Sequence, residues 1–339
     1  MTRAFRILLL IACLALPGGL LACGGEEEKE QTAAEILRGT VRSGGAGIDN
    51  GRLALRFQLD PEGLLAIGGP VKFTLDGPFA ASRSGELTRF RTDFVATLAH
   101  RPYRGSVLST GRRALVALDD GTYEVDRATV DRLRRSSRSR KGPAGLPVTG
   151  FAPQRWITAP RRKGEARIDG VDTIRVGGRL NVARLLADLD GLLTKAGGSS
   201  SGSTLLTPKL RRQIAATVES STVDVWTGKA DGLLRRLAVR IVFFFKDDSS
   251  PLQVLRGGTI NLSLRLAGVN ATAAPARTFA APRTRARPLA DLTGGSPANI
   301  LEGIAAGITG GRGRELFACL TAADGSSSSL VRCVSKLAP

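Results

Sequence analysis

Hydrophobic and polar residues alternate along several segments between residues 52 and 266. In the segment Arg52–Leu59, for example, every second residue is Leu or Phe. Successive side chains of an extended strand point to opposite faces of a sheet, so this alternation predicts strands with one apolar and one polar face. About eleven strands are predicted, at Arg52–Leu59, Val71–Leu75, Phe90–Leu98, Ser106–Ser109, Ala114–Leu118, Thr122–Val125, Ala166–Ile168, Thr173–Val176, Thr222–Trp226, Leu237–Lys246 and Gly258–Leu266. Tight turns are predicted at Asp76-Gly77-Pro78, Asp119-Asp120-Gly121 and Asp169-Gly170.

Fewer segments show the spacing of an amphipathic helix. Helices are predicted at Thr32–Arg42, Asp126–Arg135, Val182–Ala196 and Leu206–Ser220. The apolar face that the strands form together has to be buried, which requires a second sheet, helices laid across it, or a ligand. The helices at Val182–Ala196 and Leu206–Ser220 are the candidates for a partial cover.

The first 22 residues have the layout of a secretory signal peptide. Arg3 and Arg6 precede an apolar run of ten residues, which is too short to cross a bilayer. The sequence Leu-Leu-Ala-Cys at residues 20–23 resembles the lipobox of bacterial lipoproteins, in which the cysteine is diacylated and becomes the new N-terminus. We therefore expect a signal peptide at 1–22, a lipid anchor on Cys23 and a flexible tether at 23–31. An ordinary signal peptide with an incidental cysteine is the alternative.

Two of the four cysteines remain after this assignment, because Cys13 lies in the signal peptide and Cys23 is the acylation candidate. The other two, Cys319 and Cys333, lie near the C-terminus, in a small helical tail that follows a linker rich in Ala, Pro, Thr and Arg. An even pair in an exported protein predicts a disulfide. Two free thiols are the alternative.

The chain carries 49 Lys and Arg against 30 Asp and Glu, a formal charge of +19. Loss of Arg3 and Arg6 with the signal peptide would leave 47 basic residues and a charge of +17. An exported protein does not meet the genome, and the basic residues follow no nucleic-acid-binding motif, so no nucleic acid is expected as a partner. A GC-rich genome explains the abundance of Arg, and attraction to anionic lipid headgroups is the functional alternative.

Residues suited to catalysis or metal binding are scarce. The single histidine, His100, follows a predicted strand and is expected to be a solvated turn residue. The sequence contains no Gly-x-Ser-x-Gly, no phosphate-binding loop and no metal-ligand spacing. The adjacent carboxylates at Asp119–Asp120 and at Asp247–Asp248 would point to opposite faces of a strand. We expect no enzyme activity, no cofactor and no metal site.

Several short motifs occur in a characteristic order. They are Leu53-x-Leu55, Gly69-Pro70-Val71-x-Phe73, Gly121-x-Tyr123, Trp156, Gly164-x-Ala166-x-Ile168-Asp169-Gly170-Val171-x-Thr173, and Trp226-Thr227-Gly228-x-x-Asp231 with Arg235-Arg236-Leu237. With the cysteine and acidic tether ahead of them, this layout is similar to actinobacterial envelope lipoproteins of the LppX/LprG class, and more distantly to the LolA/LolB lipoprotein carriers and RseB-like sensors. The resemblance covers residues 32–268, and the linker and Cys-containing tail at 269–339 have no counterpart in it.

This resemblance implies an α+β fold in which a curved antiparallel sheet, an unclosed half-barrel, carries helices across its concave face. It also implies a cavity for acyl chains, for which the candidate lining residues are Leu55, Phe57, Phe73, Phe94, Leu186, Ile241, Phe243, Leu262 and Leu264. The expected function is that of a lipoprotein on the extracytoplasmic face of the cell membrane that binds or carries lipid. Its partners would be acyl chains and the membrane. The alternative is a sensor or scaffold of the same fold that acts through an envelope protein partner.

Aromatic residues gather at Trp156, at Trp226 and in the run Phe243-Phe244-Phe245. Core packing is one explanation for these residues. The other is that the inward-facing ones line a lipid cavity, whose wall has to be apolar. A dry core and a cavity wall have the same sequence signature, so the sequence leaves both interpretations open.

Overall fold

The computed structural model describes residues 31–46, 48–63, 69–81, 86–98, 100–138, 153–188, 208–245, 256–271, 276–280 and 285–292. The chain divides into two units, Met1–Thr32 and Ala33–Pro339, and the helices and strands described below belong to the second. The predicted signal peptide, Cys23, Cys319, Cys333 and the predicted helical tail lie outside the described residues.

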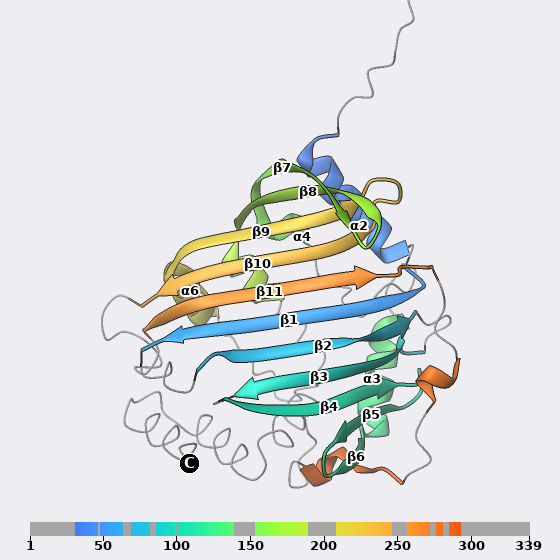
Figure 1. Ribbon diagram of the computed structural model, residues 1–339. Helices are drawn as coiled ribbons and strands as arrows, with labels where there is room; N and C mark the ends of the chain where they lie inside the picture. Colours follow the sequence, from blue (N-terminus) through green and yellow to red (C-terminus); the bar gives the residue numbers. More distant parts are fainter. Residues whose placement is uncertain are drawn as a thin grey trace, which may run out of the picture. The chain divides into compact units, whose positions relative to one another are not determined.

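The second unit is built on one sheet of twelve strands (Figure 1). The strands are β1 (Asn50–Glu62), β2 (Val71–Ala80), β3 (Arg89–Leu98), β4 (Arg101–Ser109), β5 (Ala114–Leu118), β6 (Gly121–Glu124), β7 (Ile157–Ile168), β8 (Val171–Leu180), β9 (Val218–Gly228), β10 (Leu234–Phe244), β11 (Gly257–Ala267) and β12 (Arg287–Pro288). Their order across the sheet is β12-β6-β5-β4-β3-β2-β1-β11-β10-β9-β8-β7. Two antiparallel meanders, β1 to β6 and β7 to β11, therefore meet where β1 pairs with β11. The sheet does not close, because β7 and β12 remain as its two edges.

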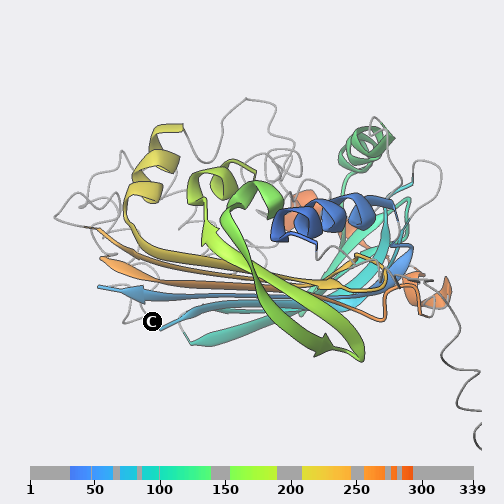
Figure 2. The same cartoon turned by 90° about the horizontal axis from the view of Figure 1, so that it is seen from above.

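Most of the helices lie on one side of this sheet. They are α2 (Ala33–Ala46), α3 (Arg127–Arg138), α4 (Pro153–Trp156) and α6 (Pro208–Ala216), together with the helical residues 182–188 and the short 3-10 helix η3 (Leu289–Leu292). The short 3-10 helix η2 (Ala276–Phe279) packs on the other side, where Phe279 is buried with Ala80, Leu108 and Leu115. Figure 2 shows the sheet edge-on, with α2, α3, α4 and α6 on the same side. The predicted fold class is confirmed: the fold is α+β, a curved, unclosed sheet with helices across one face.

The strand register gathers the alternating hydrophobic residues on the side that the helices cover. Leu55 of β1 lies opposite Leu264 of β11 and, on its other side, opposite Leu75 of β2. The alternation continues along the second meander, where Leu237 of β10 lies opposite Val225 of β9. We call the side that carries these residues the apolar face and the opposite side the polar face.

One predicted turn is wrong, because β2 runs straight through Asp76-Gly77-Pro78. A Cβ atom on Gly77 would lie 2.0 Å from the carbonyl oxygen of Arg91 on β3. Glycine therefore allows a close approach of the neighbouring strand at this point, and the chain does not reverse there. The turns predicted at Asp119-Asp120-Gly121 and Asp169-Gly170 do join β5 to β6 and β7 to β8.

The end of one helix and the number of strands also differ from the prediction. The helix predicted at Leu206–Ser220 ends at Ala216, and β9 begins at Val218. The sequence from Val218 to Thr222 is rich in β-branched and hydroxyl side chains, which favour strand over helix. The sheet has twelve strands because Arg287–Pro288, inside the predicted linker, pairs in parallel with β6.

Candidate functional site

The apolar face brings together the residues predicted to line a cavity. Eight of them lie on this face of β1, β2, β3, β10 and β11, namely Leu55, Phe57, Phe73, Phe94, Ile241, Phe243, Leu262 and Leu264. The ninth, Leu186, lies in the helical residues 182–188 and packs against the same hydrophobic cluster. Residues that are more than two hundred positions apart in the sequence, such as Leu55 and Leu264, thus share one surface.

Burial changes from strand to strand across the apolar face. On β8, β9 and β10 the side chains are buried beneath α2, α4 and residues 182–188, and this cluster includes Val176, Val223, Val225, Leu237, Val239 and Ile241. On the three middle strands β1, β2 and β11, Phe79, Leu264 and Leu266 are buried, but nine other apolar side chains are only half-buried. We call these nine side chains the apolar band: Leu53, Leu55, Phe57, Leu59, Val71, Phe73, Leu75, Ile260 and Leu262.

The apolar band carries no charged side chain on its own face of β1, β2 or β11. The register turns the charged residues of these strands, such as Arg56, Lys72 and Arg265, to the polar face. Toward β3 the band continues into Phe94, which is buried and whose ring stacks on that of Phe73 with 6.2 Å between the centroids. The band is therefore a purely apolar surface flanked by buried side chains at both sides.

Helix α2 closes one end of the apolar face, a placement that the sequence did not predict. Ile36 and Leu37 project from α2 into the cluster over β8 to β10 and are buried there. The buried hydroxyls of Thr40 on α2 and Thr227 on β9 form a hydrogen bond of 2.7 Å. The amphipathic pattern of residues 33–41 predicted the helix, and only the packing showed where its apolar side lies.

Trp156 belongs to the core of the same cluster. Its side chain has no exposed surface, and its Nε1 donates a hydrogen bond of 2.8 Å to Oδ2 of Asp188. Arg155 adds an ion pair to the same carboxylate, at 3.3 Å from Oδ1. Because Asp188 ends the described helical residues 182–188, these contacts attach that helix to α4. Of the two interpretations of Trp156, core packing is confirmed.

The Phe243-Phe244-Phe245 run is divided between the two faces. Phe243 and Phe245 lie together on one side, with their rings edge to face and 5.8 Å between the centroids. Phe244 points the other way, onto the polar face, and is exposed. Strand alternation produces this split, since neighbouring side chains of a strand point to opposite faces.

Trp226 lies on the polar face and not in a lipid cavity. It sits between Arg175 of β8 and Arg236 of β10, whose guanidinium groups lie 5.1 Å and 4.9 Å from the ring centroid. The sequence pattern indicates this placement. Val223 and Val225 lie on the apolar face, so Trp226, the next residue of the strand, lies on the polar face.

Asp224 lies two residues before Trp226 on the same face and forms ion pairs with two basic side chains. Nη2 of Arg175 lies 2.8 Å from Oδ2, and Nζ of Lys163 lies 2.9 Å from Oδ1. Burial raises the pKa of Asp224, but the hydrogen bonds from Arg175 and Lys163 outweigh burial and hold the pKa below its ordinary value. The carboxylate is therefore charged at neutral pH and joins β7, β8 and β9.

Asp224→Asn is expected to lower the free energy of unfolding at pH 7 by about 1 kcal/mol. Because the pKa is lower in the folded state, the wild type holds this contribution above about pH 4 and loses it as the pH falls through the folded pKa. Urea denaturation, repeated from pH 7 down to the lowest pH at which the protein folds, measures the free energy of unfolding of both proteins. The difference between the wild type and the variant should become smaller as the pH falls. Asp172→Asn, at an exposed pair 3.9 Å from Arg167, is the control with little effect at any pH. A difference in free energy of unfolding that stays constant with pH would contradict the lowered pKa of Asp224.

Residues 285–292 cover the β6 edge of the sheet. Arg287 lies over the ring of Tyr123, 4.4 Å from the centroid, and its Nη2 donates to the backbone carbonyl of Asp120 at 2.8 Å. Burial and then the hydrogen bond to Asp120 raise the pKa of Tyr123. Leu289 follows and is buried against the β5 and β6 side chains. The pairing of Arg287–Pro288 with β6 occupies backbone groups at the edge of β6 that could otherwise pair with another strand.

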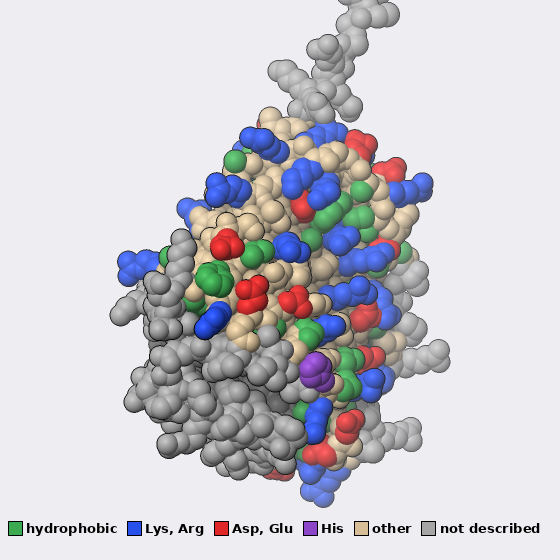
Figure 3. Space-filling model, turned by 60° about the vertical axis from the view of Figure 1, so that its left-hand side comes forward, with side chains coloured by type: hydrophobic (Ala, Val, Ile, Leu, Met, Phe, Trp, Pro, Cys, Tyr) green, Lys and Arg blue, Asp and Glu red, His purple; other side chains and the backbone are tan. Residues whose placement is uncertain are grey.

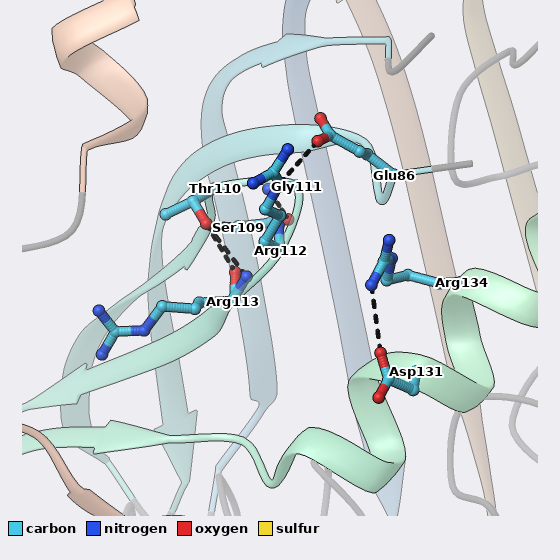
Figure 4. A network of polar contacts seen from close by, with 8 residues as sticks. All are labelled: Glu86, Ser109, Thr110, Gly111, Arg112, Arg113, Asp131 and Arg134. Carbon is cyan, nitrogen blue, oxygen red and sulfur yellow. Dashed lines mark hydrogen bonds and ion pairs between the residues drawn. The ribbon is translucent and has the colours of Figure 1, made fainter. Parts of the chain in front are cut away.

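Polar contacts fix the turn between β4 and β5 (Figure 4). Oγ of Ser109 accepts from the backbone N–H of Gly111 at 3.3 Å, and Oγ1 of Thr110 accepts from that of Arg113 at 3.1 Å. Nε of Arg112 donates to Glu86 at 2.9 Å, which holds the turn to the segment before β3. Figure 4 also shows the Arg134–Asp131 pair on α3, at 3.2 Å. These contacts are structural, since each group is satisfied by its neighbour.

The part of the chain that the structure describes contains no group of three or more His, Cys, Asp or Glu placed to hold a metal ion. His100 lies exposed in the turn between β3 and β4, as predicted, with a left-handed backbone φ of 62°. Within the same ranges, no helix combines the length and apolarity that a membrane span requires.

Comparison with known proteins gives matches of structure only. No family model matches the chain, and neither does any curated protein. The crystal structure of the lipoprotein LppX from Mycobacterium tuberculosis matches with 13% identity and a TM-score of 0.37, over 71% of this chain and 97% of that one. LprF from Mycobacterium bovis matches with 15% identity and a TM-score of 0.39, over 71% and 94% of the two chains. A LolA superfamily protein from Nitrosomonas europaea matches with 10% identity and a TM-score of 0.20, over 74% and 98%. LppX and a LolA superfamily protein, whose classes the sequence resembles, are thus among the structures to which this chain is similar.

Proposed function

We propose that this protein is an extracytoplasmic lipoprotein, held at the cell membrane by acylated Cys23, that carries lipid acyl chains on the apolar face of its sheet. In this proposal residues 1–22 are the signal peptide and residues 23–31 the tether. Residues 32–268 hold the lipid, and residues 269–339 form the linker and tail. The chemistry is reversible binding, without a covalent step.

The apolar band is the observation that carries the proposal. Its nine half-buried side chains come from three adjacent strands and form one contiguous patch. A folded domain normally buries such a surface, and a large apolar patch that stays accessible marks a site for a ligand or partner. The band lies between the cluster over β8 to β10 and the buried Phe94 and Ala96 of β3, so a bound chain would be sheltered at both sides.

Acyl chains fit the chemistry of this surface. Each methylene group that leaves water for the band contributes about 0.8 kcal/mol, or roughly 25 cal/mol per Å² of apolar surface. The band holds no charged group that a hydrocarbon chain would have to desolvate, since the charged residues of β1, β2 and β11 are on the polar face. An apolar ligand of variable length is therefore accommodated better than a polar one.

Extraction of the purified full-length protein with organic solvent tests the proposal. The protein isolated from membranes is expected to release lipid in a stoichiometric amount, identified by mass spectrometry. Acyl chains attached at Cys23 would remain on the protein during extraction, so the released lipid reports reversible binding. A Cys23→Ser variant from the same cells should release the same lipid. If both preparations are free of lipid, the carrier function is wrong and a sensor or scaffold of the same fold is favoured.

A further inference from the structure

Several cations on the polar face of the sheet have no partner within the described residues. Five of them are Arg56 on β1, Lys72 on β2, Arg104 on β4, Arg179 on β8 and Arg240 on β10. All five side chains are exposed, and none makes an ion pair or a side-chain hydrogen bond with the described part of the chain. We call these five side chains the cationic group.

The strand register places the cationic group in two adjacent rows across the sheet. The first row, from β2 to β8, consists of Lys72, Gln58, Asn261, Arg240, Thr222 and Arg179, and contains no acid. The second row, from β4 to β9, consists of Arg104, Val95, Thr74, Arg56, Ser263, Ala238 and Asp224. Its single acid, Asp224, is already paired with Arg175 and Lys163. The two rows thus form a positively charged strip over seven or more strands.

Other acids on this face do not cancel the strip. Asp76 forms an ion pair with Arg52, and Asp169 forms one with Arg265. Asp93 on β3 and Asp60 on β1 each lie one row away from the strip, and Asp60 accepts hydrogen bonds from Gln58. Glu62 is exposed at the end of β1, two rows away from the strip and in the row of Phe244. Figure 3 looks obliquely onto this side of the molecule, and Lys and Arg side chains predominate there over Asp and Glu. Helices α2, α3, α4 and α6 lie on the apolar face (Figure 2), and on the polar face the short helix η2 covers Ala80, Leu108 and Leu115, which lie outside the two rows.

Phe244 adds an apolar element at one end of the strip. It follows Arg240 by four residues on β10, so the two side chains share the polar face. Its side chain is 40% exposed, and it is the large hydrophobic residue that stays exposed among those the structure describes. Aromatic side chains beside basic residues are typical of surfaces that rest at the headgroup level of a membrane.

We propose that the cationic group and Phe244 form a docking surface for an anionic phospholipid bilayer. The partner is argued from charge complementarity: a basic residue close to an anionic membrane surface contributes about 1 kcal/mol, and this contribution falls off within a Debye length. Docking through this surface turns the apolar face, with its helices, away from the bilayer. The inference does not depend on the carrier function, because the two surfaces lie on opposite sides of the sheet.

A membrane fits this surface better than a nucleic acid does. Single-stranded nucleic acids need aromatic side chains on which bases stack. Trp226 is covered by Arg175 and Arg236, so Phe244, at one end of the strip, is the single aromatic side chain that the described part of this surface exposes. A broad strip of separated cations with one exposed aromatic side chain is suited to a layer of headgroups better than to a series of stacked bases.

Co-sedimentation with vesicles tests the proposal. The full chain carrying Cys23→Ser, which removes the predicted acylation site, is mixed with vesicles of phosphatidylcholine alone or with phosphatidylglycerol added. We expect the protein to bind the anionic vesicles, and we expect this binding to weaken as the salt concentration rises. The variant Arg56→Gln/Arg179→Gln/Arg240→Gln should lower the partition coefficient on the order of 100-fold. The matched control, Arg42→Gln/Arg127→Gln/Arg135→Gln, removes the same charge from exposed positions on α2 and α3 and should change it little.

Three outcomes would overturn the docking surface. Equal loss of binding in both triple variants would mean that net charge alone acts, and equal binding to both kinds of vesicle would exclude a headgroup charge effect. Binding to heparin without binding to anionic vesicles would assign the strip to a soluble polyanion. Each result is distinguishable from a failure of the carrier function, which is read from extracted lipid.

A Phe244→Trp variant locates the contact. Trp156 and Trp226 are almost fully buried, so the new side chain dominates any change in fluorescence on binding. Its emission is expected to shift to the blue with anionic vesicles and to be quenched by brominated acyl chains. An unchanged emission while the protein is vesicle-bound would show that the polar face is not the docking surface.

Discussion

Leu55→Glu is expected to reduce the lipid that co-purifies with the protein by about tenfold or more, while the fold persists. Leu55 lies in the middle of the apolar band, opposite Leu264 and Leu75, and it is only half-buried. A carboxylate there would have to lose its hydration whenever an acyl chain binds, which is strongly unfavourable, whereas it stays hydrated in the lipid-free protein. The measurement is lipid per protein by extraction and mass spectrometry.

Ala54→Glu is the matched control for this variant. Ala54 is the preceding residue on the same strand, points to the polar face and lies opposite Arg265, so a glutamate there meets a cation. It adds the same charge to β1 and should leave the lipid content unchanged. Circular dichroism and thermal denaturation check that both variants fold. Equal lipid in folded Leu55→Glu and in the wild type would show that the apolar band does not hold the ligand.

Trp156→Ala is expected to lower the free energy of unfolding by about 3–5 kcal/mol, the largest stability effect that we predict. The side chain is fully buried among Ile36, Leu37 and Val182, and its removal leaves a cavity that the neighbours cannot fill. The hydrogen bond from its Nε1 to Asp188 is lost as well. Urea denaturation followed by circular dichroism measures the change.

Two further variants separate the contributions at this position. Trp156→Phe keeps most of the ring but removes the N–H donor, so its effect should be about 1–2 kcal/mol, in line with one lost hydrogen bond to a charged acceptor. Trp226→Ala, on the polar face, should destabilise the protein less than Trp156→Ala, because it removes two cation–π contacts and no core packing. If the two tryptophans were equally sensitive, the assignment of Trp156 to the core would be wrong.

Local patterns were sufficient to predict the strands and their faces. The alternation in β1, β10 and β11 was long enough to assign each side chain to a face, and the register confirms these assignments for Leu55, Phe57 and Leu264. Chain reversals at Asp120-Gly121 and Asp169-Gly170 were predicted from residue type alone. The same reasoning failed at Asp76-Gly77-Pro78, because there the glycine serves a neighbouring strand that is distant in sequence.

Packing between distant segments was not predictable in the same way. Helix α2 was predicted as an isolated element, but its contact with β9 through Thr40 and Thr227 joins residues 187 positions apart. The pairing of Arg287 with Tyr123, which turns part of a linker into an edge strand, depends on a contact across 164 positions. Short-range periodicity contains no information about such contacts.

The sequence by itself determined that this protein has an amphipathic antiparallel sheet, because a period of two residues is a local property of an extended chain. It also predicts an N-terminal signal and anchor, because these are linear motifs, and both stay predictions. Only the tertiary structure decided which part of the apolar face becomes core and which part remains as the half-buried band on β1, β2 and β11. The physical reason is that burial depends on where the helices pack, and the same leucines and phenylalanines suit a covered strand and an open one equally well.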